Sequence, residues 1–156
     1  MGTAISLRRA SMDDGDLLLE WRNDPLTRAA SHTTSEITRE EHQKWLKESL
    51  AHPNRQLYIA EEYGIPVGIV RADFDSTDHS TKLSWTVAPM ARDRGVGKRM
   101  VALLADQIKG SVRAELKVGN VASARIAKGL GMQFEYEKDG VLFFRRPPVE
   151  DVRIHV

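Results

Sequence analysis

Apolar and polar residues alternate in some stretches of the chain and recur at helical spacing in others, which predicts a mixture of strands and helices. The stretches with the two-residue period of a strand are residues 4–9, 56–62, 66–74, 82–87, 112–118, 132–137 and 141–145. Helical spacing is found around Leu17, Leu18 and Trp21, in a short turn over residues 26–30, and over residues 38–51, 95–108 and 120–129. Residues 32–37 are polar, and we expect a loop there.

Residues at the ends of these segments support the boundaries. Thr38 and Glu41 have the spacing of a capping box, in which each side chain bonds the backbone N–H of the other residue. Pro25 disfavours helix at the residue before it and separates the first helix from the short turn. Asp139-Gly140 suits a hairpin turn. The residues expected to face inward from the helix over residues 95–108 are Val96, Met100, Leu103, Leu104 and Ile108.

The order of predicted elements is β-α-α-β-β-β-α-β-α-β-β, which indicates an α/β fold with a mixed sheet and helices on both faces. Strand 82–87, the helix after it and strand 112–118 are expected to form a right-handed βαβ unit with parallel strands. A chain of 156 residues without repeats or linkers suits a single domain over residues 1–156, with residues 146–156 as a C-terminal tail.

The composition excludes several kinds of site and partner. Lys plus Arg number 23 and Asp plus Glu number 22, so the net charge of +1 gives no general attraction to nucleic acid or to membranes. The absence of cysteine excludes disulfides, thiolate zinc sites and a cysteine nucleophile. The five histidines lack metal-ligand spacing, so we expect no metal. Neither a signal peptide nor an apolar run of about 18 residues is present, and we therefore expect a cytoplasmic protein without a membrane span.

A glycine-rich turn follows predicted strand 82–87 and opens the next helix. It reads Arg92-Asp93-Arg94-Gly95-Val96-Gly97-Lys98, and its glycines let the backbone approach a ligand closely. Free N–H groups at a helix N-terminus bind anions, and the arginines and the lysine add positive charge. The turn therefore predicts a phosphate or pyrophosphate site. A P-loop is excluded because Arg99 follows Lys98, and a Rossmann turn is excluded because Met100 replaces its third glycine.

Residues 92–97 match the pattern (Q/R)-x-x-G-x-(G/A), and the turn therefore resembles the acetyl-CoA signature of the GCN5-related N-acetyltransferases. Residues 120–132 resemble the downstream N-x-x-(A/S)-x-x-x-x-x-K-x-G-(F/M) stretch of that family, with Lys128 one place early. The order of elements is also the family's, and the resemblance covers residues 5–145. It implies a mostly antiparallel sheet with one splayed parallel strand pair, in an enzyme that transfers acetyl from acetyl-CoA to a primary amine.

In this family the pantetheine arm of acetyl-CoA inserts between the splayed strands like an additional strand. By resemblance, the end of strand 82–87 would bond the pantetheine, and the turn would hold the pyrophosphate through its N–H groups. The residues expected to bind acetyl-CoA are Thr86, Val87, Arg92, Arg94, Gly95, Val96, Gly97, Lys98, Asn120 and Ser123. Asn120 is also in the position of a helix N-cap, and the two roles are compatible.

The sequence departs from the family pattern at the catalytic groups. The position of the helix tyrosine that serves many members as general acid holds Ala127, and the nearest tyrosine, Tyr136, is on the next strand. Catalytic residues therefore stay unassigned. The candidates for catalysis or for positioning the amine are Thr86, Ser84, Asp73, Asp75, Glu61 and Glu62. The alternative for each carboxylate is a solvated surface group, and the alternative for the whole chain is a non-catalytic coenzyme A-binding module.

The N-terminal third shapes the acceptor site in this family. Residues 21–25 (Trp-Arg-Asn-Asp-Pro) and 40–45 (Glu-Glu-His-Gln-Lys-Trp) resemble a branch that acetylates amino groups on nucleotide-linked sugars. Similar segments also occur in acetyltransferases for protein N-termini and small amines. The residues expected at the acceptor site are Arg22, His42, Trp45, Arg71 and Asp73. The alternatives are core packing for Trp45, helix capping for Arg22 and plain solvation for His42.

The expected partner is thus a small-molecule amine, with a nucleotide sugar as the first choice. A ribosomal-protein or peptide N-terminus is the second choice, and an antibiotic or polyamine the third. The resemblance also leaves a homodimer open, because dimers are common in the family and residues 141–156 could reach a second copy.

Overall fold

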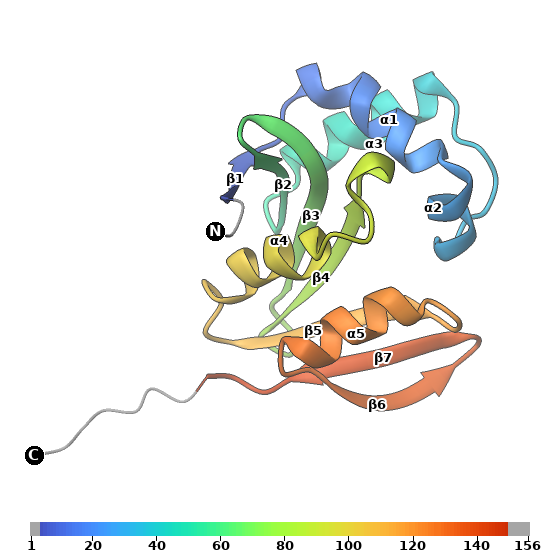
Figure 1. Cartoon of the computed structure of the whole chain (residues 1–156). Coiled ribbons are helices and arrows are strands. Elements are labelled where there is room, and N and C mark those ends of the chain that lie inside the picture. Colours follow the sequence, from blue (N-terminus) through green and yellow to red (C-terminus); the bar gives the residue numbers. More distant parts are fainter. Residues whose placement is uncertain (1–3, 150–156) are drawn as a thin grey trace, which may run out of the picture.

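Seven strands form one mixed sheet in the computed structural model, which describes residues 4–149 (Figure 1). The strands are β1 (Ile5–Arg9), β2 (Arg55–Glu62), β3 (Ile65–Asp75), β4 (Ser80–Val87), β5 (Ser111–Lys117), β6 (Gln133–Lys138) and β7 (Val141–Arg146). The helices are α1 (Gly15–Asn23), α2 (Pro25–Ala30), α3 (Arg39–Ala51), α4 (Val96–Ala105) and α5 (Val121–Gly129), with 3-10 turns at Met12–Asp14 and Pro89–Ala91. The predicted order of elements is confirmed.

The strand order is β1-β2-β3-β4-β5-β7-β6, and the neighbouring strands are antiparallel except for β4 and β5. The parallel ladder joins residues 80–82 of β4 to residues 111–113 of β5 and goes no further. Beyond Lys82, β4 keeps its pairing with β3 and has no pairing with β5. The mostly antiparallel sheet with one splayed parallel pair is therefore confirmed, and the splay opens toward the carboxyl ends of both strands.

Helices cover the two faces of the sheet. α4 packs against β1, β3 and β4, whereas α3 packs against β2 and α1. Successive side chains of β3 point to opposite faces of the sheet, so neighbouring residues contact different helical layers. Gly68 lies against Met100 of α4, and the next residue, Ile69, lies with Trp45 of α3 around the cavity described below. Met100 and Leu46, one from each layer, are fully buried.

Gly68→Ala is expected to destabilise the fold, because no room exists for a methyl group between β3 and α4. A Cβ atom on Gly68 would lie 2.5 Å from Met100 Sδ and 2.9 Å from the carbonyl oxygen of Thr86. We expect the free energy of unfolding in urea to fall by about 1–3 kcal/mol. Gly15→Ala is the control, since its Cβ would meet Leu46 at 3.6 Å, an ordinary contact. Equal losses in the two variants would contradict this packing argument.

Three predicted details are wrong. α4 ends at Ala105 instead of residue 108. After it, Ile108 N donates to Ala105 O, which is the i→i+3 spacing of a 3-10 turn. Leu103, predicted to face inward, is 37% exposed. At the start of α3, Thr38 Oγ1 accepts the N–H of Glu41 at 3.2 Å. The reciprocal capping box is formed elsewhere, by Ser11 and Asp14.

β7 extends through Arg146 and so includes the first residue of the expected tail. Val149 N donates to Lys109 O at 2.8 Å, which holds the chain against the loop after α4. Residues 150–156 of the expected tail lie outside the described residues. Within residues 4–149, no helix combines the length and the apolar character needed to cross a membrane.

Candidate functional site

A cavity of about 570 Å³ lies where β4 and β5 diverge and extends to α1 and α3. β4 contributes residues 82–86, β5 contributes residues 115–117, and the N-terminal turn of α5 closes one side. The predicted site residues that line the cavity are Arg22, His42, Trp45, Arg71, Ser84, Thr86, Asn120 and Ser123. The splay thus brings together residues predicted for the acceptor, for catalysis and for acetyl-CoA.

The glycine-rich turn leads from β4 into α4. Gly95 is the N-cap of α4 at φ +73°, a conformation that glycine adopts without strain. The first bond of the helix runs from Arg99 N to Gly95 O at 3.3 Å, so the N–H groups of residues 96–98 precede it. Gly97 is buried, and a Cβ there would lie 2.8 Å from Ile126 Cδ1 and 3.1 Å from Val87 Cγ2. The turn therefore presents backbone donors at a helix N-terminus, which suits an anion.

The two arginines of the turn are engaged with carboxylates from distant parts of the chain. Arg92 Nη2 donates to Asp24 Oδ2, and also to Thr27 Oγ1 at 3.1 Å. Arg94 Nη1 donates to Glu62 Oε1 at 3.0 Å. Both arginines thus hold the turn against α2 and β2. Lys98, in contrast, forms no ion pair within residues 4–149, and its charge is available to a phosphate.

The open edge of β4 faces the start of α5 across the cavity. Thr86 and Val87 lie beyond the end of the parallel ladder, so β5 does not cover this edge. Asn120 Oδ1 accepts the N–H of Ser123 at 3.2 Å, which establishes the helix-capping role expected for this side chain. Asn120 and Ser123 also line the cavity, so their position is compatible with the second expected role.

Arg22 brings an incompletely paired cation to the acceptor side. Its Nη2 donates to Thr33 O at 2.8 Å, whereas Nη1 is buried and has no hydrogen-bond partner in the described part of the chain. Burial, with a smaller contribution from Arg28, lowers the pKa of Arg22. An arginine stays protonated in proteins, so this positive charge has no ion-pair partner within residues 4–149. Buried charges of this kind are stabilised by an anionic partner.

His42 is not a solvated residue of α3, contrary to the alternative interpretation of the sequence. The side chain is 4% exposed, and its ring lies 5.3 Å from the ring of Trp45, centroid to centroid. Both rings line the cavity. Burial and the nearby Arg22 lower the pKa of His42. The neutral imidazole is therefore favoured in the folded protein.

This lowered pKa predicts a loss of stability in mild acid. Between the folded-state pKa and the ordinary value of about 6.5, the unfolded chain binds more protons than the folded one. The free energy of unfolding should therefore decrease as the pH falls below about 6.5. We expect urea denaturation at about pH 7.5 and about pH 5.5 to show a smaller pH effect in His42→Gln than in the wild type. Other titrating groups are common to both proteins, so identical pH effects would contradict the assignment to His42.

None of the four predicted catalytic carboxylates lines the cavity. Asp73 pairs with Arg55 at 2.6 Å and with Arg71 at 3.1 Å, and it lines a separate open pocket. Asp75 bonds Thr77, Glu61 pairs with Arg8, and Glu62 pairs with Arg94. Of the candidate residues, Ser84 and Thr86 line the cavity, and Ser84 Oγ accepts a bond from Arg71 Nη2 at 3.3 Å. Neither residue is a carboxylate.

Within residues 4–149, no tyrosine lines the cavity in place of the missing helix tyrosine. Ala127 is fully buried in α5. Tyr136 is half exposed on β6 and stacks on Phe143, with ring centroids 4.4 Å apart. Tyr136 does not line the cavity.

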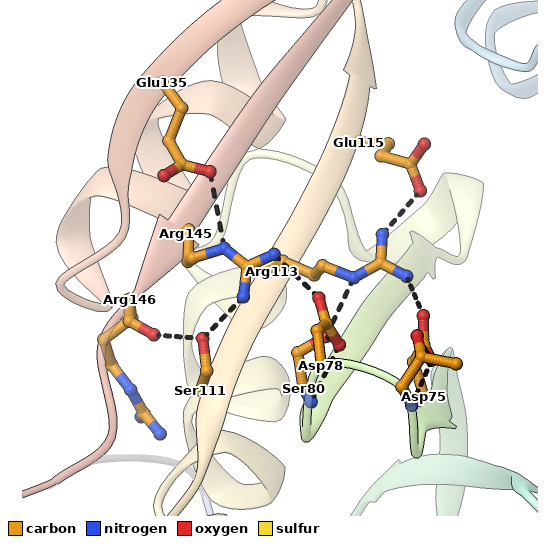
Figure 2. A network of polar contacts seen from close by, with 10 residues as sticks. Asp75, Asp78, Ser80, Ser111, Arg113, Glu115, Glu135, Arg145 and Arg146 are labelled. Carbon is orange, nitrogen blue, oxygen red and sulfur yellow. Dashed lines mark hydrogen bonds and ion pairs between the residues drawn. The ribbon is translucent and has the colours of Figure 1, made fainter.

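Glu115 is a cavity carboxylate that the sequence analysis missed. It lies on β5 next to the splay, and its Oε2 is 3.1 Å from Lys82 Nζ. The same oxygen lies 3.1 Å from Arg113 Nη1 (Figure 2). The strand pattern contained a signal, because Arg113, Glu115 and Lys117 alternate with buried apolar residues. α1 and α3, which are distant in the sequence, enclose part of this face of β5 as the cavity. Within residues 4–149, no group of three or more side chains could hold a metal ion.

Comparisons with known proteins agree with this architecture. The family model of the acetyltransferase (GNAT) domain matches residues 5–133. No curated protein matches the sequence. Among solved structures, the chain is similar to the ribosomal-protein-alanine N-acetyltransferase of Brucella melitensis, with 24% identity and a TM-score of 0.75 over 91% of this chain and 99% of that one.

Two further structures contain coenzyme A. One is RimL, a ribosomal L7/L12 alpha-N-protein acetyltransferase, with 14% identity and a TM-score of 0.80 over 94% of this chain and 96% of that one. The other is the aminoglycoside acetyltransferase AAC(6′)-Ib, with 18% identity and a TM-score of 0.79 over 92% of this chain and 95% of that one. At these identities the likeness shows the fold, whereas the family model spans most of the sequence. The chain therefore belongs to the GNAT acetyltransferase family.

Proposed function

We propose that this acetyltransferase transfers the acetyl group of acetyl-CoA to a primary amine on an acceptor that also carries an anionic group. The observation that carries the proposal is the cavity between the splayed strands β4 and β5. Side chains of α1 and α3 line one part of the cavity, and the unpaired edge of β4 and the start of α5 line the other part. A site of this shape can hold two substrates that meet between the strands.

The turn and the strand edge are suited to the two parts of acetyl-CoA. The N–H groups of residues 96–98 and the charge of Lys98 would hold the pyrophosphate. The edge of β4 near Thr86 and Val87 would bond the pantetheine amides as an added strand does. Asn120 and Ser123 would contact the same arm from α5. The coenzyme A in RimL and in AAC(6′)-Ib supports this assignment, because those folds are similar.

The reaction requires a neutral amine, and Glu115, which lines the cavity, would receive the proton of the ammonium form. The amine nitrogen attacks the thioester carbon, the new C–N bond forms, and the C–S bond breaks to release the coenzyme A thiolate. Glu115 takes one proton from the ammonium form of the acceptor before the attack, directly or through water. The second proton, which the nitrogen loses as the amide forms, goes to the departing thiolate. Lys82 and Arg113 hold Oε2 of that carboxylate, which leaves Oε1 for the amine. The thiolate needs no strong acid, since a thiol of this kind has a pKa near 8.5.

The charges around the cavity favour an anionic acceptor. Arg22, Arg71, Lys82 and Lys117 line it, against the two carboxylates Glu41 and Glu115. Of the cations, Lys82 is neutralised by Glu115 and Arg71 by Asp73, whereas Arg22 has a buried Nη1 without a partner among residues 4–149. A guanidinium binds phosphate oxygens through two parallel bonds. We therefore propose a nucleotide-linked amino sugar as the acceptor, with its phosphates near Arg22 and its amine near Glu115. A polycationic aminoglycoside suits this lining less well.

An acceptor panel tests the proposal. The full chain is incubated with acetyl-CoA and, in turn, a UDP-linked amino sugar, a peptide with a free N-terminal alanine, kanamycin and spermidine. Release of the coenzyme A thiol is followed by its reaction with a disulfide dye. Turnover only with the UDP-linked amino sugar would support the acceptor assignment. Turnover only with the peptide or a polyamine would overturn that assignment while leaving the acetyl transfer. Coenzyme A binding without any turnover would favour a non-catalytic module instead.

A further inference from the structure

The strands that splay around the cavity are joined at their other end by a network of polar side chains (Figure 2). Ser80 is the first residue of β4 and Ser111 the first residue of β5, and the two are paired in the parallel ladder. Both serines are buried. Two arginines bond them: Arg145 of β7 and Arg113 of β5. The polar contacts are thus concentrated at the closed end of the splay.

Arg145 connects both strands through a single guanidinium. Its Nη1 donates to Ser111 Oγ at 3.0 Å, and its Nη2 donates to Asp78 Oδ2 at 3.0 Å. Asp78 Oδ1 in turn accepts the hydroxyl of Ser80 at 2.6 Å and the N–H of Ser80 at 3.1 Å. The hydroxyl of Ser80 and then Arg145 lower the pKa of Asp78 to about 2, so the carboxylate stays ionised at physiological pH. Arg145 therefore fixes the start of β5 against the start of β4.

Arg113 stands at the last pair of the ladder and leads to the cavity. Its Nε donates to Ser80 Oγ at 3.1 Å, and its Nη1 donates to Glu115 Oε2 at 3.1 Å. Its Nη2 lies 3.8 Å from Asp75 Oδ2 on the end of β3. Beyond this residue the two strands are no longer paired. Arg113 thus links the closed end of the splay to Glu115 in the cavity lining.

We propose that Arg145 and Arg113 are positioning residues that set the separation of β4 and β5, and with it the width of the cleft for the pantetheine arm. The inference rests on the proposed binding of acetyl-CoA between these strands. A parallel ladder of three residue pairs has few backbone bonds to resist rotation of one strand against the other. Side-chain bonds at its first and last pairs remove that freedom. Small displacements of such supporting groups reduce the fit of a bound substrate.

Calorimetric titration of the full chain with coenzyme A tests this inference without a known acceptor. Arg145→Met keeps the aliphatic stem and removes the bonds to Ser111 and Asp78. We expect its Kd for coenzyme A to rise about tenfold at a temperature at which circular dichroism shows a folded protein. Arg145→Lys keeps the charge and one bond, and its Kd should lie between those of the wild type and the methionine variant. If Arg145→Met does not fold, the lysine variant carries the comparison.

Arg8→Met is the matched control. Arg8 lies on the outer strand β1 and pairs with Asp14 at 2.8 Å and with Glu61 of β2 at 3.2 Å. Its side-chain exposure is similar to that of Arg145. A control with wild-type affinity, beside a weakened Arg145 variant, would support the inference. Unchanged affinity in the Arg145 variants, or equal weakening in the control, would overturn it. If the wild type binds no coenzyme A, the proposed function itself is overturned. If the wild type binds it and Arg145→Met binds it equally well, only the inference about Arg145 fails.

Discussion

Gly95→Val is expected to abolish coenzyme A binding while leaving the chain folded. Gly95 has φ +73° at the N-cap of α4, and β-branched residues avoid this region. The variant must therefore change the backbone of the turn, which redirects the N–H groups of residues 96–98 away from a shared anion. We expect the Kd for coenzyme A, measured by calorimetry, to rise at least about 100-fold, equivalent to about 2.7 kcal/mol of binding free energy.

Gly140→Val is the control that distinguishes loss of the binding site from loss of stability through backbone strain. Gly140 has φ +78° in the turn between β6 and β7, and a Cβ there, as at Gly95, would meet nothing within 4 Å. The two substitutions thus introduce the same strain, about 1–3 kcal/mol, in equally open surroundings. Both variants should lose similar stability in urea, and only Gly95→Val should lose coenzyme A. Wild-type affinity in Gly95→Val would mean that the turn does not hold the pyrophosphate.

The part of the site that the sequence predicted is local in the chain. Residues 92–98 form one continuous turn, so its glycines and its place between a strand and a helix can be read directly. The cap at Asn120 is equally local, since its acceptor and donor are three residues apart. The splay was also predicted, from resemblance, and the short ladder between β4 and β5 confirms it. Each of these features depends on a few consecutive residues or on the order of elements.

The features that escaped prediction depend on contacts between distant residues. Arg92 was expected to bind acetyl-CoA, and its ion pair with Asp24, 68 positions away, could not be predicted from the turn alone. His42 was expected at the acceptor site, with plain solvation as the alternative, and its burial against Trp45 could not be predicted from the pattern of one helix. Thr38 lacks the reciprocal bond of its predicted capping box, whereas Ser11 and Asp14 form theirs. In each case tertiary packing decides among side-chain partners that the local sequence permits.

Glu115→Gln is expected to lower kcat about 10²–10³-fold with the amine that the acceptor panel identifies. The amide keeps the size of the side chain and can no longer accept the proton of the attacking amine. The KM for acetyl-CoA should change little, because the turn and the β4 edge are untouched. Raising the pH toward the pKa of an alkyl ammonium, about 10, should recover part of the rate, because neutral amine then forms in solution.

Glu61→Gln is the control for the loss of one ion-paired carboxylate. Glu61 pairs with Arg8 and has a side-chain exposure of 22%, close to the 25% of Glu115, but it does not line the cavity. Its kcat should match that of the wild type. Wild-type kcat in Glu115→Gln would mean that Glu115 does not accept the proton of the amine. His42 would then be the next group to test, because its neutral imidazole also faces the cavity and can accept a proton.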